Sequence, residues 1–207
     1  MRRLLTILLF FVLIACGTKY DYEDTGVSNP YFKGDMLEYL MSDSYNWDSV
    51  VLMINRAGLD SIFRTENITF MGLTNHTIRQ WLIQGGKGYE AGYRQIADIP
   101  VEMCRAIVLS HVFDGKYLRN DIARVELNEK GEYVGGGNKF VTRYGNTIWL
   151  WTKQSSYMGV AGLGPVYLCM TNQATNTIAS ADIQPYNGVV HSLEYSYKID
   201  NIGKLPY

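Results

Sequence analysis

Histidine and cysteine are the residues of this chain whose side chains could most readily carry chemistry. The sequence has three histidines, His76, His111 and His191, and three cysteines. If the imidazoles met at one site, they could bind a metal or act as a general base. However, there is no His-x-His, His-Glu-x-x-His or Cys-x-x-Cys spacing and no Gly-x-Ser-x-Gly elbow. We therefore predict a non-catalytic protein with no cofactor and no metal site, and keep a hydrolase that uses His111 or His191 as an alternative.

Aromatic side chains are a second chemical feature, because they can stack on the apolar faces of sugar rings. In the run 147–152, strand alternation puts Trp149 and Trp151 on the same face. Two interpretations stay open. Either the tryptophans fill a core, or they form an exposed platform that binds a ligand together with Tyr144 or Tyr157.

The first sixteen residues resemble an export signal. Two arginines precede an apolar stretch from Leu4 to Ala15, which is typical of a secretory signal peptide. The stretch is shorter than the roughly 20 residues of a membrane-spanning helix. It ends in Leu13-Ile14-Ala15-Cys16, which resembles the lipobox of bacterial lipoproteins at all four positions. This resemblance implies cleavage before Cys16 and acyl chains such as palmitate on that residue, which would anchor the protein in a membrane.

The residues after the lipobox favour the outer membrane. Gly17 stands where an aspartate would resemble an inner-membrane retention signal, and the acidic run 19–24 resembles the export signal of surface lipoproteins in some Gram-negative bacteria. Without residues 1–15, which hold two arginines, 17 basic and 20 acidic residues remain, giving a net charge of about −3. This balance excludes a nucleic-acid groove. We expect an outer-membrane lipoprotein at the cell surface.

The chain after the signal peptide (1–15) is predicted to be an acylated tether, residues 16–34, and one folded domain, residues 35–207. A hydrophobic content of 47% with 19% charged residues is typical of a folded chain. Cys104 and Cys169 lie in apolar stretches, so we expect two buried free thiols, although a disulfide between them stays open.

Helical periodicity dominates the first half of the domain and strand-like runs the second. Helices are expected over Asp35–Met41, from Asn46 as cap to Gly58, from Thr74 or Asn75 as cap to Gly85, and from Pro100 with Val101 on the inner face. Trp47 and Trp81 fall on apolar helical stripes and are predicted to lie in the core. Strands are expected at 68–73, 122–127, 139–144, 147–152, 166–170, 177–183 and 189–197. This order predicts an α+β fold.

Four blocks of the chain are similar, in order, to the conserved blocks of fasciclin domains. They are residues 68–75 (Ile-Thr-Phe-Met-Gly-Leu-Thr-Asn), Ser110-His111-Val112, Thr142 to Asn146, and Asp182-Ile183 followed by residues 187–194 (Asn-Gly-Val-Val-His-Ser-Leu-Glu). Over residues 36–197 the chain therefore resembles a divergent fasciclin domain. Leu73 replaces the usual proline, and Ser110 replaces the usual tyrosine. The resemblance implies N-terminal helices packed on a C-terminal β-sandwich or wedge of about six or seven short strands.

The resemblance also implies roles for particular residues. Those expected to organise the fold are Thr74, Asn75, His111, Asn187, Gly188 and His191, the histidines through hydrogen bonds to backbone. Asp182 and Ile183 match the position of a motif linked to receptor binding in animal members. Function is then expected to be adhesion or binding of a glycan or protein partner at the envelope, as an accessory to surface polysaccharide uptake. The alternative is a structural subunit of an envelope complex.

Overall fold

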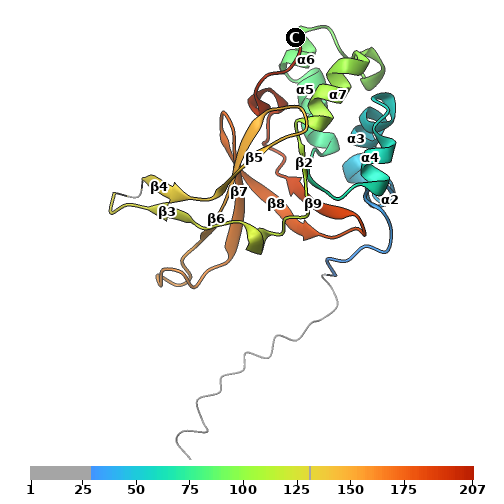
Figure 1. Ribbon diagram of the computed structural model, residues 1–207. Coiled ribbons are helices and arrows are strands. Elements are labelled where there is room, and N and C mark those ends of the chain that lie inside the picture. The colour runs from blue at the N-terminus through green and yellow to red at the C-terminus, as the bar shows by residue number, and fades with distance from the viewer. Residues whose placement is uncertain (1–28, 131) are drawn as a thin grey trace, which may run out of the picture.

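The structure is a computed structural model that describes residues 29–130 and 132–207. The predicted signal peptide, Cys16 and residues 17–28 lie outside this part. Helices gather on one side of a curved sheet, in two adjoining layers (Figure 1). The described chain begins against this sheet, where Tyr31 bridges Gln184 and the Phe32 N–H donates to the Gln184 carbonyl at 3.0 Å. The Phe32 ring packs edge-on against Tyr39, with 5.4 Å between centroids.

The first helices begin at aspartates. The Asp35 carboxylate accepts a hydrogen bond from the Glu38 N–H, and the Glu38 carboxylate accepts one from the Asp35 N–H. Both hydrogen bonds are 2.8 Å long, and together they form a capping box. Asp43 caps the next helix by accepting from the Asn46 N–H, so the prediction of Asn46 as the cap was wrong. These two helices are α2 (Met36–Ser42) and α3 (Ser44–Arg56), and α4 (Asp60–Thr65) follows without a side-chain cap.

The remaining helices complete one layer. They are α5 (Asn75–Ile83), α6 (Lys87–Glu90) and α7 (Val101–Leu109), with 3₁₀ turns η1 (Ile96–Asp98), η2 (Arg119–Asp121) and η3 (Ile199–Ile202). Val101, expected on the inner face of α7, is 45% exposed. It lies in the first turn, where the buried stripe formed by Met103, Cys104 and Ile107 has not yet begun.

One sheet contains seven strands in the order β2-β1-β9-β8-β7-β6-β5. They are β1 (Ile68–Gly72), β2 (Val112–Asp114), β5 (Asn138–Val141), β6 (Thr147–Gln154), β7 (Val166–Thr171), β8 (Thr175–Ile183) and β9 (Gly188–Leu193). Among the strand pairs of this sheet in the described part of the chain, β1–β9 alone is parallel. The two edges approach each other, since the Arg143 N–H donates to the Val112 carbonyl at 2.8 Å. The α+β prediction with about seven strands is confirmed.

A second sheet, the arm, is a hairpin of β3 (Val125–Leu127) and β4 (Tyr133–Gly136) that projects from the main sheet (Figure 1). Its base joins β6, where the Thr152 N–H donates to the Ala123 carbonyl at 3.2 Å. Strand β6 is therefore covered on both faces. Ile148 and Leu150 enter the main core, whereas Trp151 forms a small separate cluster with Val125 and Cys169 beneath the arm.

The main core lies between the helices and the sheet. Trp47 and Trp81, at 2% exposure each, lie in it as predicted. Cys104 is buried in this core and Cys169 in the small cluster, and both are free thiols, as expected. Because α7 and β7 carry them into different clusters, a disulfide between them is not formed.

Candidate functional site

Thr74 and Asn75 tie the start of α5 to α3. Thr74 is the N-cap of α5, and its hydroxyl oxygen accepts from the Thr77 N–H at 3.3 Å. The Asn75 amide donates to the carbonyls of Ser44 and Tyr45 at 2.8 and 2.7 Å. Its oxygen accepts from the Ser49 N–H at 2.7 Å. These contacts satisfy backbone groups at the start of α3 and fix the angle between the two helices.

Asn187 and Gly188 join the sheet to the first helices. The Asn187 oxygen accepts from the Met36 N–H at 2.8 Å, and its amide donates to the carbonyls of Phe63 and Glu66 at 3.0 and 3.1 Å. One side chain thus provides hydrogen-bond partners for backbone groups at the start of α2 and the end of α4. At Gly188 a Cβ would collide with the Ile68 carbonyl oxygen and the Met36 methyl group, so only glycine allows β1 and β9 to pair this closely.

His111 is completely buried between α7 and β2. Its Nδ1 lies 2.8 Å from the Ile107 carbonyl oxygen and therefore carries the hydrogen, because a carbonyl only accepts. Its Nε2 then accepts from the Tyr197 hydroxyl at 2.9 Å. Burial lowers the pKa of His111 to about 4, so the ring is neutral at pH 7.

His191, on β9, carries its hydrogen on the other ring nitrogen. The Asp182 N–H donates to its Nδ1 at 3.2 Å, so Nε2 carries the hydrogen and donates to the Tyr117 carbonyl at 2.9 Å. Burial lowers the pKa of His191 as well. Both nitrogens of each buried ring are engaged, and His76 lies apart and exposed, with its ring 5.2 Å from that of Tyr195.

No cluster of three or more His, Cys, Asp or Glu residues suited to a metal occurs within residues 29–130 and 132–207. The same part of the chain has no helix with the length and apolar character needed to cross a bilayer.

The side chains of Asp182 and Ile183 contact other residues of the same domain. Asp182 has a positive φ of 65°, at an irregularity in the β8–β9 pairing. Its carboxylate accepts from the Arg119 N–H at 2.6 Å and lies 3.8 Å from the Arg119 Nε. Ile183 is half-buried against the main core. Both side chains therefore take part in the join between η2 and β8, and their assignment to a binding site stays a prediction.

Of the two interpretations of the tryptophan pair, the structure favours the core position for Trp151. Trp151 has no exposed surface, and its indole N–H donates to the Thr171 hydroxyl at 3.0 Å, so it cannot stack on a ligand. Trp149 is half-buried and donates to the Gly136 carbonyl of the arm at 3.2 Å. Tyr144 and Tyr157 are exposed, but they lie beyond opposite ends of β6. At ~3.3 Å per residue, this eight-residue strand separates them by about 25 Å.

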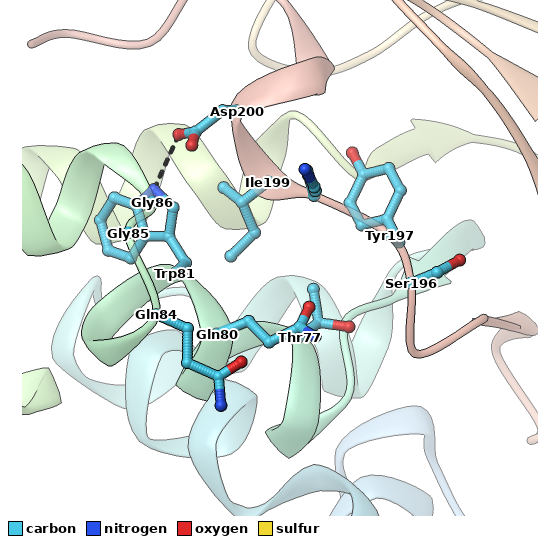
Figure 2. Close-up of a pocket in the computed structure, with 11 residues that line it drawn as sticks. Thr77, Gln80, Trp81, Gln84, Gly85, Gly86, Ser196, Tyr197, Ile199 and Asp200 are labelled. Atoms are coloured by element: carbon cyan, nitrogen blue, oxygen red, sulfur yellow. Dashed lines mark hydrogen bonds between the residues drawn. The ribbon is translucent and has the colours of Figure 1, made fainter.

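A cavity of about 390 Å³ lies between α5, residues 84–86 and the segment 196–200 (Figure 2). Thr77 and Gln80 of α5 face Tyr197 and Ile199 across it. Amides, hydroxyls and a carboxylate share its wall with apolar groups; the lining residues are Thr77, Gln80, Trp81, Gln84, Gly85, Gly86, Ser196, Tyr197, Lys198, Ile199 and Asp200. This mixture of groups suits a small polar ligand.

Asp200 fixes one wall of this cavity. Its carboxylate accepts from the Trp81 indole N–H at 2.9 Å, the Lys87 N–H at 3.1 Å and the Tyr207 hydroxyl at 2.7 Å. Burial and the hydrogen bond to Asp200 both raise the pKa of Tyr207. No sequence motif marks this cavity, because its two walls are separated by more than a hundred residues. The one local feature of the sequence that points to the cavity is the Gly85-Gly86 pair, which lies at the rim of the cavity.

Comparison with known proteins identifies the fold. The chain matches the solved structure of a FAS1 domain pair from the insect cell adhesion molecule Fasciclin I, with a TM-score of 0.54 over 82% of this chain. The fold is fasciclin-like. Identity to that structure is 12%, so the fasciclin-like domain is a divergent one, and it spans about half (53%) of that two-domain structure. No family model matches the chain, and no curated protein does.

Proposed function

We propose that the protein is a non-catalytic adhesion or binding module, held at the outer membrane by acyl chains on Cys16 and presenting its fasciclin-like domain to a glycan or protein partner at the cell surface. The observation that carries this proposal is the match to the domain pair of a cell adhesion molecule. The lipobox-like sequence before Cys16 supports the anchor.

The state of the buried histidines supports a non-catalytic role. General base catalysis needs an imidazole within hydrogen-bond reach of a substrate proton. His111 and His191 have no free nitrogen and lie in the domain interior, so they are unsuited to this task.

The cavity beside α5 is the part of the domain best suited to a glycan. Sugars are recognised by planar amides and carboxylates that pair with hydroxyl groups, alongside apolar surface that contacts the ring. Gln80 and Gln84 supply the amides, and Asp200 supplies the carboxylate. A protein partner would instead cover a wider surface.

Glycan arrays and envelope polysaccharides, probed with the acylated protein in detergent, test this assignment. The double variant Gln80→Ala, Gln84→Ala is expected to lose at least ten-fold in glycan affinity, about 1.4 kcal/mol, while Gln154→Ala at the far end of β6 retains it. Absence of glycan binding, together with a stoichiometric envelope protein in cross-linked cells, would favour the structural-subunit alternative.

Metabolic labelling with a fatty acid tests the anchor. Cys16→Ser is expected to abolish label incorporation and release the protein from the membrane fraction. Cys104 and Cys169 remain in this variant and serve as internal controls, because both are buried. Continued incorporation in Cys16→Ser would contradict the assignment.

A further inference from the structure

The loop between β6 and β7, residues 155–165, is an apolar protrusion. Its exposed large apolar side chains are Met158 (86%), Leu163 (65%), Tyr157 (60%) and Val160 (52%). The whole segment 154–166 contains no charged residue. Four large apolar side chains gathered on one loop are unusual on a surface that faces only water.

This loop is held in one shape. Tyr157 and Val160 exchange backbone hydrogen bonds of 3.0 and 2.9 Å around Met158 and Gly159. The φ angles of these two central residues are 48° and 81°, as in a type I′ hairpin turn. Asparagine or glycine normally occupies the first of these positions, so placing methionine there costs backbone strain. A strained turn that presents an apolar side chain at its apex points to a binding role.

The same end of the domain receives the tether. Tyr31 bridges Gln184 near the start of the described chain. Close by, Asp182 contacts Arg119, whose guanidinium donates at 3.2 Å to the carbonyl of Val166 at the base of the loop. Figure 1 shows this loop and the blue start of the described chain at the lower end, whereas α6 and the C-terminus lie at the upper end.

The surroundings of the tether suit a lipid headgroup region. Tyr31 and Tyr186 are 67% and 69% exposed, and Lys33 and Lys116 are exposed beside them. Tyrosine prefers the membrane interface, and lysine extends its charge toward lipid headgroups. These residues also line a cavity of about 420 Å³ at this end.

Cys16 and Asn29 are thirteen residues apart. At no more than ~3.6 Å per residue, this segment keeps Asn29 within about 47 Å of an acylated Cys16. At such a distance the effective concentration of the loop near the bilayer is high, so a weak apolar contact is enough.

We propose that loop 155–165, together with Tyr31 and Tyr186, forms a membrane-facing end that lies on the lipid bilayer, with Met158, Val160 and Leu163 in its interfacial region. The inference rests on the lipid anchor of the proposed function. It orients the domain so that the cavity beside α5 points away from the membrane, toward a partner.

Site-directed labelling of the acylated full chain in phosphatidylethanolamine–phosphatidylglycerol vesicles tests this orientation. An environment-sensitive dye is placed on Val160→Cys, and in the matched control on Ile83→Cys, which is also exposed but lies on α5. The native thiols are buried and burial raises the pKa of each, so they react slowly, and the unsubstituted chain serves as blank. At position 160 we expect a blue-shifted emission and several-fold stronger quenching by nitroxide-labelled lipid than at position 83.

Met158→Asp in the chain labelled at position 160 should reduce the quenching to the level of the control. Aspartate accepts a positive φ better than methionine, so this variant should remain folded, as checked by thermal melting. Equal quenching at positions 160 and 83 overturns the inference, as does shielding of position 160 without vesicles, which would reveal self-association. Fatty-acid incorporation is measured on the same sample: its presence with an unshielded loop overturns the orientation alone, and its absence overturns the anchor as well.

Discussion

A few buried polar side chains connect distant parts of this chain, and Asn187 is the clearest of them. Its three hydrogen bonds reach the start of α2 and the end of α4, across more than a hundred residues. Asn187→Ala would leave these backbone groups without a partner in a dry interior. We expect the free energy of unfolding to fall by about 3 kcal/mol in urea titrations. Asn55→Ala on the exposed face of α3 should change it little, and a similar loss in both variants would contradict this role.

The buried imidazole of His111 makes stability depend on pH. Its pKa is about 4 in the folded state, below the ordinary 6.5, so the unfolded chain binds the additional proton between these values. Stability contributed by the neutral ring is therefore complete above pH 6.5 and is lost as the pH falls toward 4. The loss approaches about 3 kcal/mol, and His191 adds to it in the same direction.

Urea titrations at pH 7.5 and 5 measure this dependence. A stability that is equal at both pH values would mean that His111 is accessible to protons in the folded state.

The sequence predicted those helices and strands that have a clear periodic pattern of apolar residues. The apolar stripes of α3 and α7 and the alternation in β6 placed these elements correctly, and Gly58 marked the end of α3. Helix α4 was missed because its six residues contribute one buried side chain, Phe63. The short strands β2 and β4 were missed because they are defined by their partners and not by a pattern of their own.

Packing between elements explains why the sequence did not predict the surroundings of Trp151 or the cavity beside α5. Alternation correctly put Trp149 and Trp151 on one face, but it carries no information about what covers that face. The arm, formed by residues that follow no strong period, buries Trp151. The cavity beside α5 depends on the distant Asp200, whose role no local signal indicated.

The β1–β9 pair depends on the absence of a side chain at Gly188. In Gly188→Ala the new methyl group would overlap with the Ile68 carbonyl oxygen, which cannot move without breaking the strand pairing. We expect a loss of about 3 kcal/mol in the free energy of unfolding, measured in urea. Gly58→Ala is the matched control: its φ of 64° is unfavourable for alanine, but no atom lies within 4 Å, so it should cost about 1 kcal/mol. An equal loss of unfolding free energy in the two variants would show that the β1–β9 pair shifts to make room for the methyl group.

The whole molecule combines one large core with a small satellite cluster. The main sheet and the helices share the first, whereas the second is closed only by the two-stranded arm. A two-stranded unit with few buried side chains is marginally stable by itself. Local opening of the arm is therefore expected to cost less free energy than global unfolding.

The two buried thiols report these two events separately. Burial raises the pKa of both, so each reacts only when it becomes exposed. Cys169 lies beneath the arm and Cys104 in the main core, so iodoacetamide should modify Cys169 at least ten-fold faster, a difference of about 1.4 kcal/mol, as measured by peptide mass spectrometry. Val125→Ala removes arm contacts and should accelerate Cys169 alone, whereas Ile107→Ala weakens the main core and should accelerate Cys104 as well. Equal rates for the two thiols at every urea concentration would show that the arm opens only when the sheet unfolds.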